Sequence, residues 1–377
     1  MDRTIFEDLF VLELANNHWG KLQRGLKIID DFAKVVQFNN VKAAIKLQFR
    51  DVDTFIHKAH RSREDVRYIK KTIATQLPWS ELREMVRAVR AAGMITMCTP
   101  FDEASVDKCV EFDVEMLKLA SSDIRDLFLI EKIASAGKPV IASTGGSSLR
   151  DLDELVAFFD RRNIPFALNH CVSIYPSADS ELELNQIDFL RHRYPNTVIG
   201  FSTHECTDWR SSVLIAYAKG ARTFERHIDI DYEGVPVSPY CTRPEQADEW
   251  FKAFKKAQEM CGAAGTAKRI PPEKEIRYLD ELVRGVYAKR RLPAGHVLTE
   301  EDVYLAVPLL RGQLSCREFM RGEVLRAAIE PDAAVRLRDI DSPYSADSAL
   351  QQLIDNRGVP EVFQAAEPPR PRLAVSN

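Results

Sequence analysis

The sequence predicts an α/β fold, a closed (β/α)8 TIM barrel followed by a small C-terminal module, and three observations support this prediction. Eight short apolar runs, rich in β-branched or aromatic residues, lie within residues 10–228. A longer stretch with helical spacing follows each run, and such alternation of strand and helix indicates a parallel sheet. Each run also ends in polar side chains, at the strand end where barrels of this type carry their chemistry.

The expected elements can be assigned in order along the chain. Residues 149–162 begin with acidic and end with basic side chains, as the helix dipole favours. Residues 246–262 have one apolar face and end in glycine, so we expect the last barrel helix there. The expected strands comprise residues 10–15, 43–49, 95–101, 116–121, 139–144, 166–173, 197–203 and 223–228.

The connection at residues 50–79 is unusually long and highly charged. Long loops at this end of a barrel often shape or cover a substrate site. An excursion that forms only solvated surface is an equally good interpretation.

The chain is longer than the roughly 250 residues of a typical barrel, which predicts a second module. We expect the barrel in residues 1–268, a proline-containing linker in 269–283 and a turn-rich module in 284–340. Residues 341–377 have the composition of a partly disordered tail, with a short helix near 348–358. A module this small has a modest core, so we expect it to dock onto another surface.

The composition excludes several classes of protein. A formal net charge of −4 and a pI near 6.1 give no basic surface for nucleic acid. The N-terminus has acidic residues and no long apolar stretch, so we expect neither a signal peptide nor a membrane span. Seven cysteines without a C-x-x-C pair predict reduced thiols and a cytoplasmic enzyme.

Two histidines, His204 and His227, stand at the ends of the seventh and eighth expected strands. Neighbouring parallel strands lie about 4.8 Å apart, so both imidazoles can reach one ion. Neutral imidazoles with open coordination positions suit a divalent metal that also binds water or substrate. A pair of histidines that only packs in the core is the alternative.

Two lysines, Lys46 and Lys118, end the second and fourth expected strands. A lysine that points into a barrel mouth is costly to bury without an anion, and hydroxyl side chains follow around the ring. Together they predict a clamp for phosphate or carboxylate. Alternatively Lys118 forms a Schiff base, or the serines act only as helix N-caps. The serines at these strand ends are Ser121, Ser143, Ser173 and Ser202.

Glu13 ends the first expected strand. A carboxylate at this position can move a proton or orient a water molecule beside the metal. Its alternative role is that of a charged barrel residue paired with one of the lysines.

The chain resembles the sialic acid synthase family in eight motifs that follow one another in order. They are ELANNHWGK, KLQ, TPFD, LKLASSD, GKPVIASTGGSS, HCVSIYPS, IGFSTHE and ERHI. The C-terminal module is similar to that family's antifreeze-like (SAF) domain. The resemblance implies condensation of phosphoenolpyruvate with an aldose of the N-acylmannosamine type, giving a 2-keto-3-deoxy sugar acid and phosphate. It also implies a homodimer in which each SAF domain closes the partner's active site.

The resemblance further implies roles for individual residues. Glu13 would lie beside the aldehyde, and Gln48 and Tyr175 would line the sugar pocket. His204 and His227 would bind a divalent metal, manganese or magnesium. The residues that would hold phosphoenolpyruvate are Lys46, Thr99, Lys118, Ser121, Ser143, Ser173 and Ser202.

The chain departs from the family's pattern at four positions. Ser173 stands in place of an asparagine and Thr203 in place of an aspartate. Ser238 stands where an aspartate contacts the sugar, and Val307 where an arginine of the SAF domain does so. Ser238, and Arg311 four residues after Val307, are therefore further expected sugar contacts of this chain, in addition to Gln48 and Tyr175. These changes predict an unusual acceptor, and a catalytically inactive sugar-binding homologue is the remaining alternative.

Overall fold

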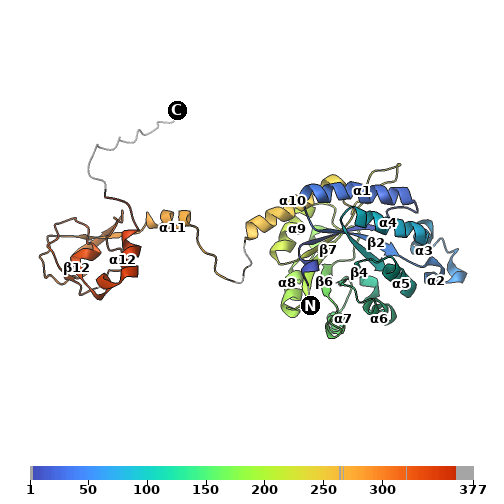
Figure 1. Ribbon diagram of the computed structural model, residues 1–377, viewed down its shortest axis with the longest axis horizontal. Helices are drawn as coiled ribbons and strands as arrows, with labels where there is room; N and C mark the ends of the chain where they lie inside the picture. The colour runs from blue at the N-terminus through green and yellow to red at the C-terminus, as the bar shows by residue number, and fades with distance from the viewer. Residues whose placement is uncertain (1–2, 263–264, 266, 320, 362–377) are drawn as a thin grey trace, which may run out of the picture. The chain divides into compact units, whose positions relative to one another are not determined.

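The computed structural model describes residues 3–262, 265, 267–319 and 321–361. These residues form two compact units that divide between residues 264 and 265, and each unit is described by itself (Figure 1). The first unit is the expected barrel, and the second contains the expected small module.

Eight parallel strands close into a barrel in chain order, and β8 pairs with β1 to complete it. The predicted fold class is therefore confirmed, and every expected strand is present. The strands are β1 (Leu9–Ala15), β2 (Ala43–Phe49), β3 (Ile95–Pro100), β4 (Met116–Leu119), β5 (Val140–Ser143), β6 (Phe166–Cys171), β7 (Val198–Thr203) and β8 (Thr223–His227).

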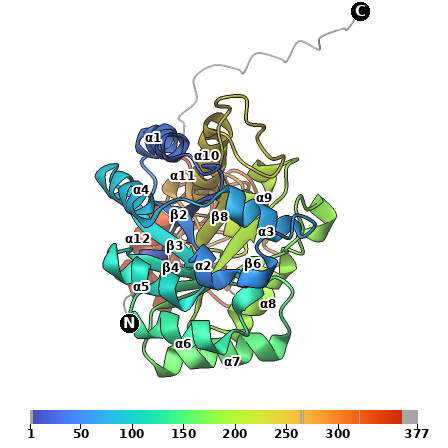
Figure 2. The same cartoon turned by 90° about the vertical axis from the view of Figure 1, so that its right-hand side faces the viewer.

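Helices surround the strands of the barrel (Figure 2). The helices expected at residues 149–162 and 246–262 are both present. They are α7 (Leu149–Arg161) and α10 (Pro244–Cys261). Gly262 ends α10 with a φ of 65°, a conformation that favours glycine. The other helices of this unit are α1 (Leu22–Asn39), α2 (Val52–Phe55), α3 (Arg67–Ala74), α4 (Trp79–Ala91), α5 (Glu103–Glu111), α6 (Leu127–Ser135), α8 (Asn185–Arg193) and α9 (Trp209–Ala218).

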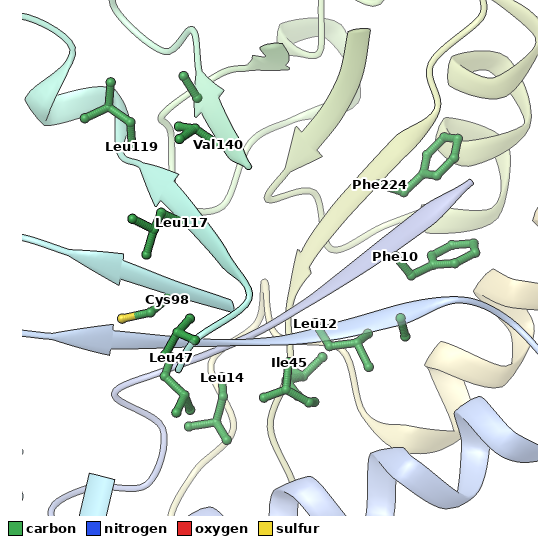
Figure 3. Close-up of a cluster of buried hydrophobic side chains, with 14 of the residues drawn as sticks. Phe10, Leu12, Leu14, Ile45, Leu47, Cys98, Leu117, Leu119, Val140 and Phe224 are labelled. Atoms are coloured by element: carbon green, nitrogen blue, oxygen red, sulfur yellow. The ribbon is translucent and has the colours of Figure 1, made fainter. Parts of the chain in front are cut away.

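Successive side chains of each strand point to opposite sides of the barrel wall. On β1, Phe10, Leu12 and Leu14 belong to the large apolar cluster between the strands and the helices (Figure 3). The ring of Phe10, for example, meets Trp250 of α10 edge to face, with the ring centroids 4.7 Å apart. Burial of this outer layer holds the helices onto the barrel.

The inward-pointing side chains form an apolar plug and, beyond it, a polar layer. The plug consists of Phe6, Leu9, Val11, Ala44, Met97, Met116, Ile141 and Ala167. On β1 the next inward residue after the plug is Glu13, and strand pairing aligns it with Lys46 on one side and His227 on the other. The same alternation on the other strands gathers the predicted polar side chains at the C-terminal strand ends.

The second unit contains two small antiparallel pairs of strands. β9 (Gly285–Ala288) pairs with β10 (Val303–Ala306), and β11 (Val324–Leu325) pairs with β12 (Ile340–Asp341). Twelve buried apolar residues, among them Val286, form its core. This core is small, as expected from the short apolar runs.

Two helices belong to the second unit. α11 (Glu273–Asp280) lies within the predicted linker, and α12 (Ser348–Asp355) is the helix predicted in the tail. Ile354 of α12 is buried in the core of the module, so contacts of this unit extend beyond residue 340. The predicted disorder of the final stretch concerns residues 362–377, which lie outside the described residues.

Two further properties of the described chain bear on its class. None of the helices described here combines the length and apolar character that a membrane span requires. All seven cysteines are free thiols.

Candidate active site

A cavity of about 510 Å³ opens at the C-terminal ends of the barrel strands. Every predicted site residue except Ser238 and Arg311 contributes to its lining. The lining residues that sequence reasoning did not single out include Tyr68, Lys71, Thr72 and Glu225.

Glu225 of β8 lies at the floor of the cavity, between the two predicted lysines. Its Oε1 accepts a hydrogen bond from Lys46 Nζ at 2.8 Å, and its Oε2 accepts one from Lys118 Nζ at 2.9 Å. Ser202 Oγ donates to Glu225 Oε1 at 3.2 Å, and Lys118 Nζ donates to Ser143 Oγ at 2.7 Å. One carboxylate, two lysines and two serines thus form a single buried network, which we call the floor network.

The charges of the floor network determine its protonation. Burial alone would raise the pKa of Glu225, but the charges of Lys118 and Lys46 hold it well below its usual value. Burial lowers the pKa of Lys46 to about 8, against the opposing attraction of Glu225. A signal for Glu225 was present in the sequence, because it lies two residues before His227 and so shares its inward face.

Glu13 contacts both the floor network and Gln48, which is predicted to line the sugar pocket. Its Oε2 lies 2.5 Å from Lys46 Nζ, and its Oε1 accepts a hydrogen bond from Gln48 Nε2 at 2.9 Å. The contact with Lys46 is an ion pair without hydrogen-bond geometry, so Oε2 is a buried acceptor that no donor satisfies. The expected pairing of Glu13 with a lysine is therefore present, and the paired oxygen, Oε2, accepts no hydrogen bond.

A glycine allows two of the predicted serines to approach each other. A Cβ atom at Gly145 would lie 2.0 Å from Ser173 Oγ and 2.8 Å from Ser121 Oγ. The Gly145 amide donates to Ser121 Oγ at 3.1 Å, so this amide is occupied within the loop. The hydroxyl groups of this rim, which line the cavity, are therefore the groups placed to bind an anion.

His204 and His227 lie side by side, with ring centroids 5.5 Å apart. Burial lowers the pKa of His204 to about 4 and the pKa of His227 well below its usual value, so both are neutral at pH 7. The Nδ1–H of His204 donates to the Val172 carbonyl oxygen at 3.0 Å, which leaves Nε2 with a free lone pair. The ring of Tyr175 covers His204, with centroids 3.9 Å apart.

The two histidines have few additional protein groups beside them that could ligate a metal. Within the described ranges, no group of three or more histidine, cysteine, aspartate or glutamate side chains is arranged to hold a metal ion. A metal at this site would therefore take two imidazoles from the protein and its remaining ligands from water or substrate.

Thr203 replaces an aspartate of the family pattern, but a carboxylate lies two residues later. Glu205 accepts a hydrogen bond from the Thr203 hydroxyl and pairs with Arg226 Nη1 at 2.6 Å. Both charged side chains are buried, and a buried charge that lost its partner would destabilise the barrel. This pair fixes the residues on either side of His204, and it lies outside the cavity lining.

The excursion at residues 50–79 contributes to the cavity rather than forming only solvated surface. Three side chains of α3 line it, namely Tyr68, Lys71 and Thr72. Arg50 connects α3 to the site, since its Nη2 donates to Tyr68 Oη at 2.5 Å and to Gln48 Oε1 at 3.1 Å. Its guanidinium also stacks on the ring of Phe101, 3.6 Å from the centroid.

Ser238 is the one predicted site residue of the barrel unit that does not line this cavity. Ser238 lies in the connection between β8 and α10, outside the lining, and Tyr240 of the same connection approaches instead, with its ring centroid 5.3 Å from His227. A turn places Ser238 there, because its carbonyl accepts a hydrogen bond from the Cys241 amide at 2.9 Å. Arg311 lies in the second unit, where it is exposed and lines a separate cavity of about 390 Å³.

Comparison with known families agrees with the motifs. A model of the NeuB family matches residues 36–265, which is more than half of the chain. A model of the SAF domain matches residues 283–341, the region of the second unit that contains β9 to β12.

Several known proteins are similar to the chain over most of its length. A solved structure from Chromobacterium violaceum ATCC 12472, described as spore coat polysaccharide biosynthesis protein E, is 36% identical, with a TM-score of 0.85 over 89% of this chain and 100% of that chain. The N-acetylneuraminate-9-phosphate synthase of Homo sapiens is 24% identical over 92% of this chain and 93% of its own. The N,N'-diacetyllegionaminic acid synthase of Campylobacter jejuni is 23% identical over 84% of this chain and 98% of its own.

Proposed function

Because the chain belongs to the NeuB family, we propose that it is a sialic acid synthase-type enzyme that condenses phosphoenolpyruvate with an aldose. C3 of phosphoenolpyruvate would bond to the aldehyde carbon, one water molecule would add at C2, and the C–O bond to phosphate would break. The products would be a 2-keto-3-deoxy sugar acid and phosphate. Two of the similar proteins are named as synthases of an N-acetylneuraminate phosphate and of a legionaminic acid, which supports this reaction class.

The observation that carries the proposal is the floor network beside a pair of neutral histidines in one cavity. An anion such as phosphoenolpyruvate is bound well by cationic and hydroxyl donors that are already oriented. The contacts with Glu225 and Ser143 hold the two lysines in fixed positions. Glu13 is paired with His227 in the strand register, so an aldehyde between them would lie next to the bound phosphoenolpyruvate.

A divalent metal, manganese or magnesium, fits the histidine pair. Both imidazoles are neutral, and His204 has a free Nε2 lone pair. When bound, such an ion would polarise the aldehyde oxygen and so make its carbon more electrophilic.

The protein's own residues would bind and orient the reactants. Lys46 and Lys118 would neutralise the negative charge of phosphoenolpyruvate and point its C3 atom at the aldehyde. Glu13 would orient a water molecule or accept its proton through Oε2. Gln48 would keep that carboxylate in place, because it donates to the other oxygen.

The alternatives receive less support. Lys118 Nζ donates to both oxygens of Glu225 and to Ser143, whereas a Schiff-base lysine must react as an amine that has a free lone pair. An inactive homologue would have no physical reason to keep two lysines and two carboxylates buried at one strand end.

N-acetylmannosamine is expected to be a poor acceptor. Ser238 and Val307 replace groups that would form charged hydrogen bonds, each worth about 1.5–3 kcal/mol, so the loss of both reduces affinity by a factor of about a hundred or more. Competition assays of N-acetylmannosamine against pentoses, hexoses and diamino sugars measure the ratio of kcat/KM. If N-acetylmannosamine gives the highest value of the panel, this interpretation of the substitutions is wrong.

A homodimer is expected in which each SAF domain closes the partner's active site. The core of the module comprises twelve buried apolar residues, so docking onto a barrel would stabilise it. Light scattering at micromolar concentration measures the mass of the assembly. A monomer that has full activity at that concentration would contradict this prediction.

The proposed reaction is tested by phosphate release from phosphoenolpyruvate in the presence of manganese across a panel of aldoses. Release that requires an aldose supports the proposal. Release that is independent of aldose would identify a phosphatase instead.

A further inference from the structure

Arg50 is the first residue after β2, and its guanidinium group contacts two side chains that line the cavity. Its Nη2 donates hydrogen bonds to Gln48 Oε1 at 3.1 Å and to Tyr68 Oη at 2.5 Å. In the described ranges, no aspartate or glutamate oxygen lies within 4.0 Å of its guanidinium nitrogens. A half-buried cation that lacks a carboxylate partner is costly, so the contacts that it does make call for an explanation.

The two neighbours of Gln48 fix the orientation of its amide group. A guanidinium group only donates hydrogen bonds and a carboxylate only accepts them, whereas an amide has one donor end and one acceptor end. Gln48 lies between Arg50 and Glu13, so its Oε1 must face the arginine and its Nε2 the glutamate. The structure has this orientation, because Nε2 donates to Glu13 Oε1 at 2.9 Å while Oε1 accepts from Arg50. Both hydrogen bonds are charge-assisted, and the amide loses one of them if it turns.

The guanidinium group of Arg50 is itself held in place. It stacks on the ring of Phe101, 3.6 Å from the centroid, and the Phe101 amide donates to the carbonyl oxygen of Phe49 at 3.1 Å. Tyr68 of α3 accepts a hydrogen bond from the same nitrogen as Gln48 does. A planar group with these contacts has one position, from which it can orient the amide of Gln48.

We infer that Arg50 is a positioning residue, which acts on Glu13 through the amide of Gln48. This inference rests on the proposed function, in which Glu13 orients a water molecule or accepts its proton through Oε2. The hydrogen bond from Gln48 holds Oε1 and thereby sets the direction of Oε2. Arg50 is not among the residues that line the cavity, so its effect passes through other side chains.

The loss of Arg50 should therefore affect turnover more than the binding of phosphoenolpyruvate. A catalytic group that is misplaced by about 1 Å can cost a factor of about a hundred in rate. The predicted phosphoenolpyruvate contacts Lys46 and Lys118 are held by Glu225, which Arg50 does not contact.

The rate test uses Arg50→Met, which keeps an unbranched side chain and removes the donors. We expect kcat of aldose-dependent phosphate release to fall by about tenfold or more, and KM for phosphoenolpyruvate to change by less than about twofold. Arg63→Met is the matched control, because Arg63 is an exposed arginine of the same excursion that pairs with Asp65, and it should keep kcat. An unchanged kcat in Arg50→Met, or a loss confined to KM, would overturn the inference.

A double-mutant cycle tests whether the effect passes through Gln48. Gln48→Met removes both ends of the amide and should lower kcat at least as much as Arg50→Met does. The variant with both substitutions should have the kcat of Gln48→Met, because no amide remains for the arginine to orient. Losses that multiply would show that Arg50 acts by another route. Arg50→Lys keeps the charge without the planar fork, and it replaces Arg50→Met in the cycle if that variant does not fold.

Crystal structures of the unmodified chain and of the Arg50 variant give a readout that does not depend on turnover. We expect Gln48 Nε2 to stay within hydrogen-bond distance of Glu13 Oε1 in the unmodified chain and to leave it in the variant. An amide that keeps its place in the variant would overturn the inference whatever the rate.

The two readouts together separate this inference from the proposed function. If the unmodified chain releases no phosphate with any aldose, the condensation falls, and the displacement of Gln48 alone decides whether Arg50 positions it. If the Arg50 variant releases phosphate at the normal rate, the condensation stands and the positioning role falls.

Discussion

Chelation of divalent metal is expected to abolish aldose-dependent phosphate release, and manganese is expected to restore it. His204→Ala and His227→Ala should each abolish turnover as well, because each removes one of only two imidazoles at the site. Electron paramagnetic resonance of added manganese measures binding directly, and we expect the affinity to fall by at least tenfold in each variant. Neither substitution should unfold the barrel, since alanine fits the inward position at a strand end.

A histidine elsewhere on the barrel provides the matched control. His192 of α8 is exposed, so His192→Ala should keep both manganese binding and turnover. Full activity after exhaustive chelation, with the absence of metal verified by elemental analysis, would contradict the metal prediction.

Lys118→Met is expected to weaken phosphoenolpyruvate binding by a factor of about a hundred or more. Truncating one partner of a buried charge pair costs on the order of 3 kcal/mol, and each 1.4 kcal/mol is a factor of ten in affinity. Lys118 is 2% exposed and bonds to Glu225 and Ser143, so its loss removes one of the two lysines that pair with Glu225. Calorimetric titration of phosphoenolpyruvate measures the change, and the affinity for acceptor analogues should change much less.

Lys132→Met is the control for the loss of a positive charge alone. Lys132 of α6 pairs with Asp107 on the outside of the barrel, so its variant should bind phosphoenolpyruvate as the unmodified chain does. If Lys118→Met also binds phosphoenolpyruvate normally, the lysine does not contact the anion and the clamp must be sought elsewhere.

The barrel could be predicted from the sequence because its strands carry two signals at once. The apolar outer face of β1 packs on helices through Phe10, Leu12 and Leu14, and polar residues end the inward face. The C-terminal ends of all strands lie at the same face of a parallel barrel. Inward residues at these ends, such as Glu13 and His227, could therefore be placed together although they are more than two hundred positions apart.

The floor network could be predicted only in part. Lysines were expected to face an anionic substrate, and their protein partner Glu225 was missed although it lies on the inward face of β8. The alternation of side chains along β8 could have shown that Glu225 points into the barrel. Which carboxylate contacts which lysine, however, depends on the lengths of side chains that reach across the barrel. Similarly, Thr203 could be noted as a departure from the family, whereas its contact with Glu205 depends on the turn after β7.

The walls of the cavity were the least predictable part of the site. Residues 50–79 have no single hydrophobic period, so the sequence left open whether they cover the site, and it gave no reason to select Lys71. Ser238 was chosen by counting along a loop, and a turn at that position keeps it outside the cavity lining. Loop geometry of this kind follows from tertiary contacts rather than from local pattern.

Isotope transfer from phosphoenolpyruvate labelled with ¹⁸O in the C–O–P bridge tests the central claim most directly. The enzyme is incubated with manganese and with the aldose that gives the highest rate, and mass spectrometry measures both products. Because water adds at C2 and the C–O bond breaks in the proposed reaction, the account predicts that the phosphate carries the label. It also predicts an equal amount of an acid whose mass is the sum of the aldose and pyruvic acid. Unlabelled phosphate with labelled pyruvate, and no such acid, would contradict it.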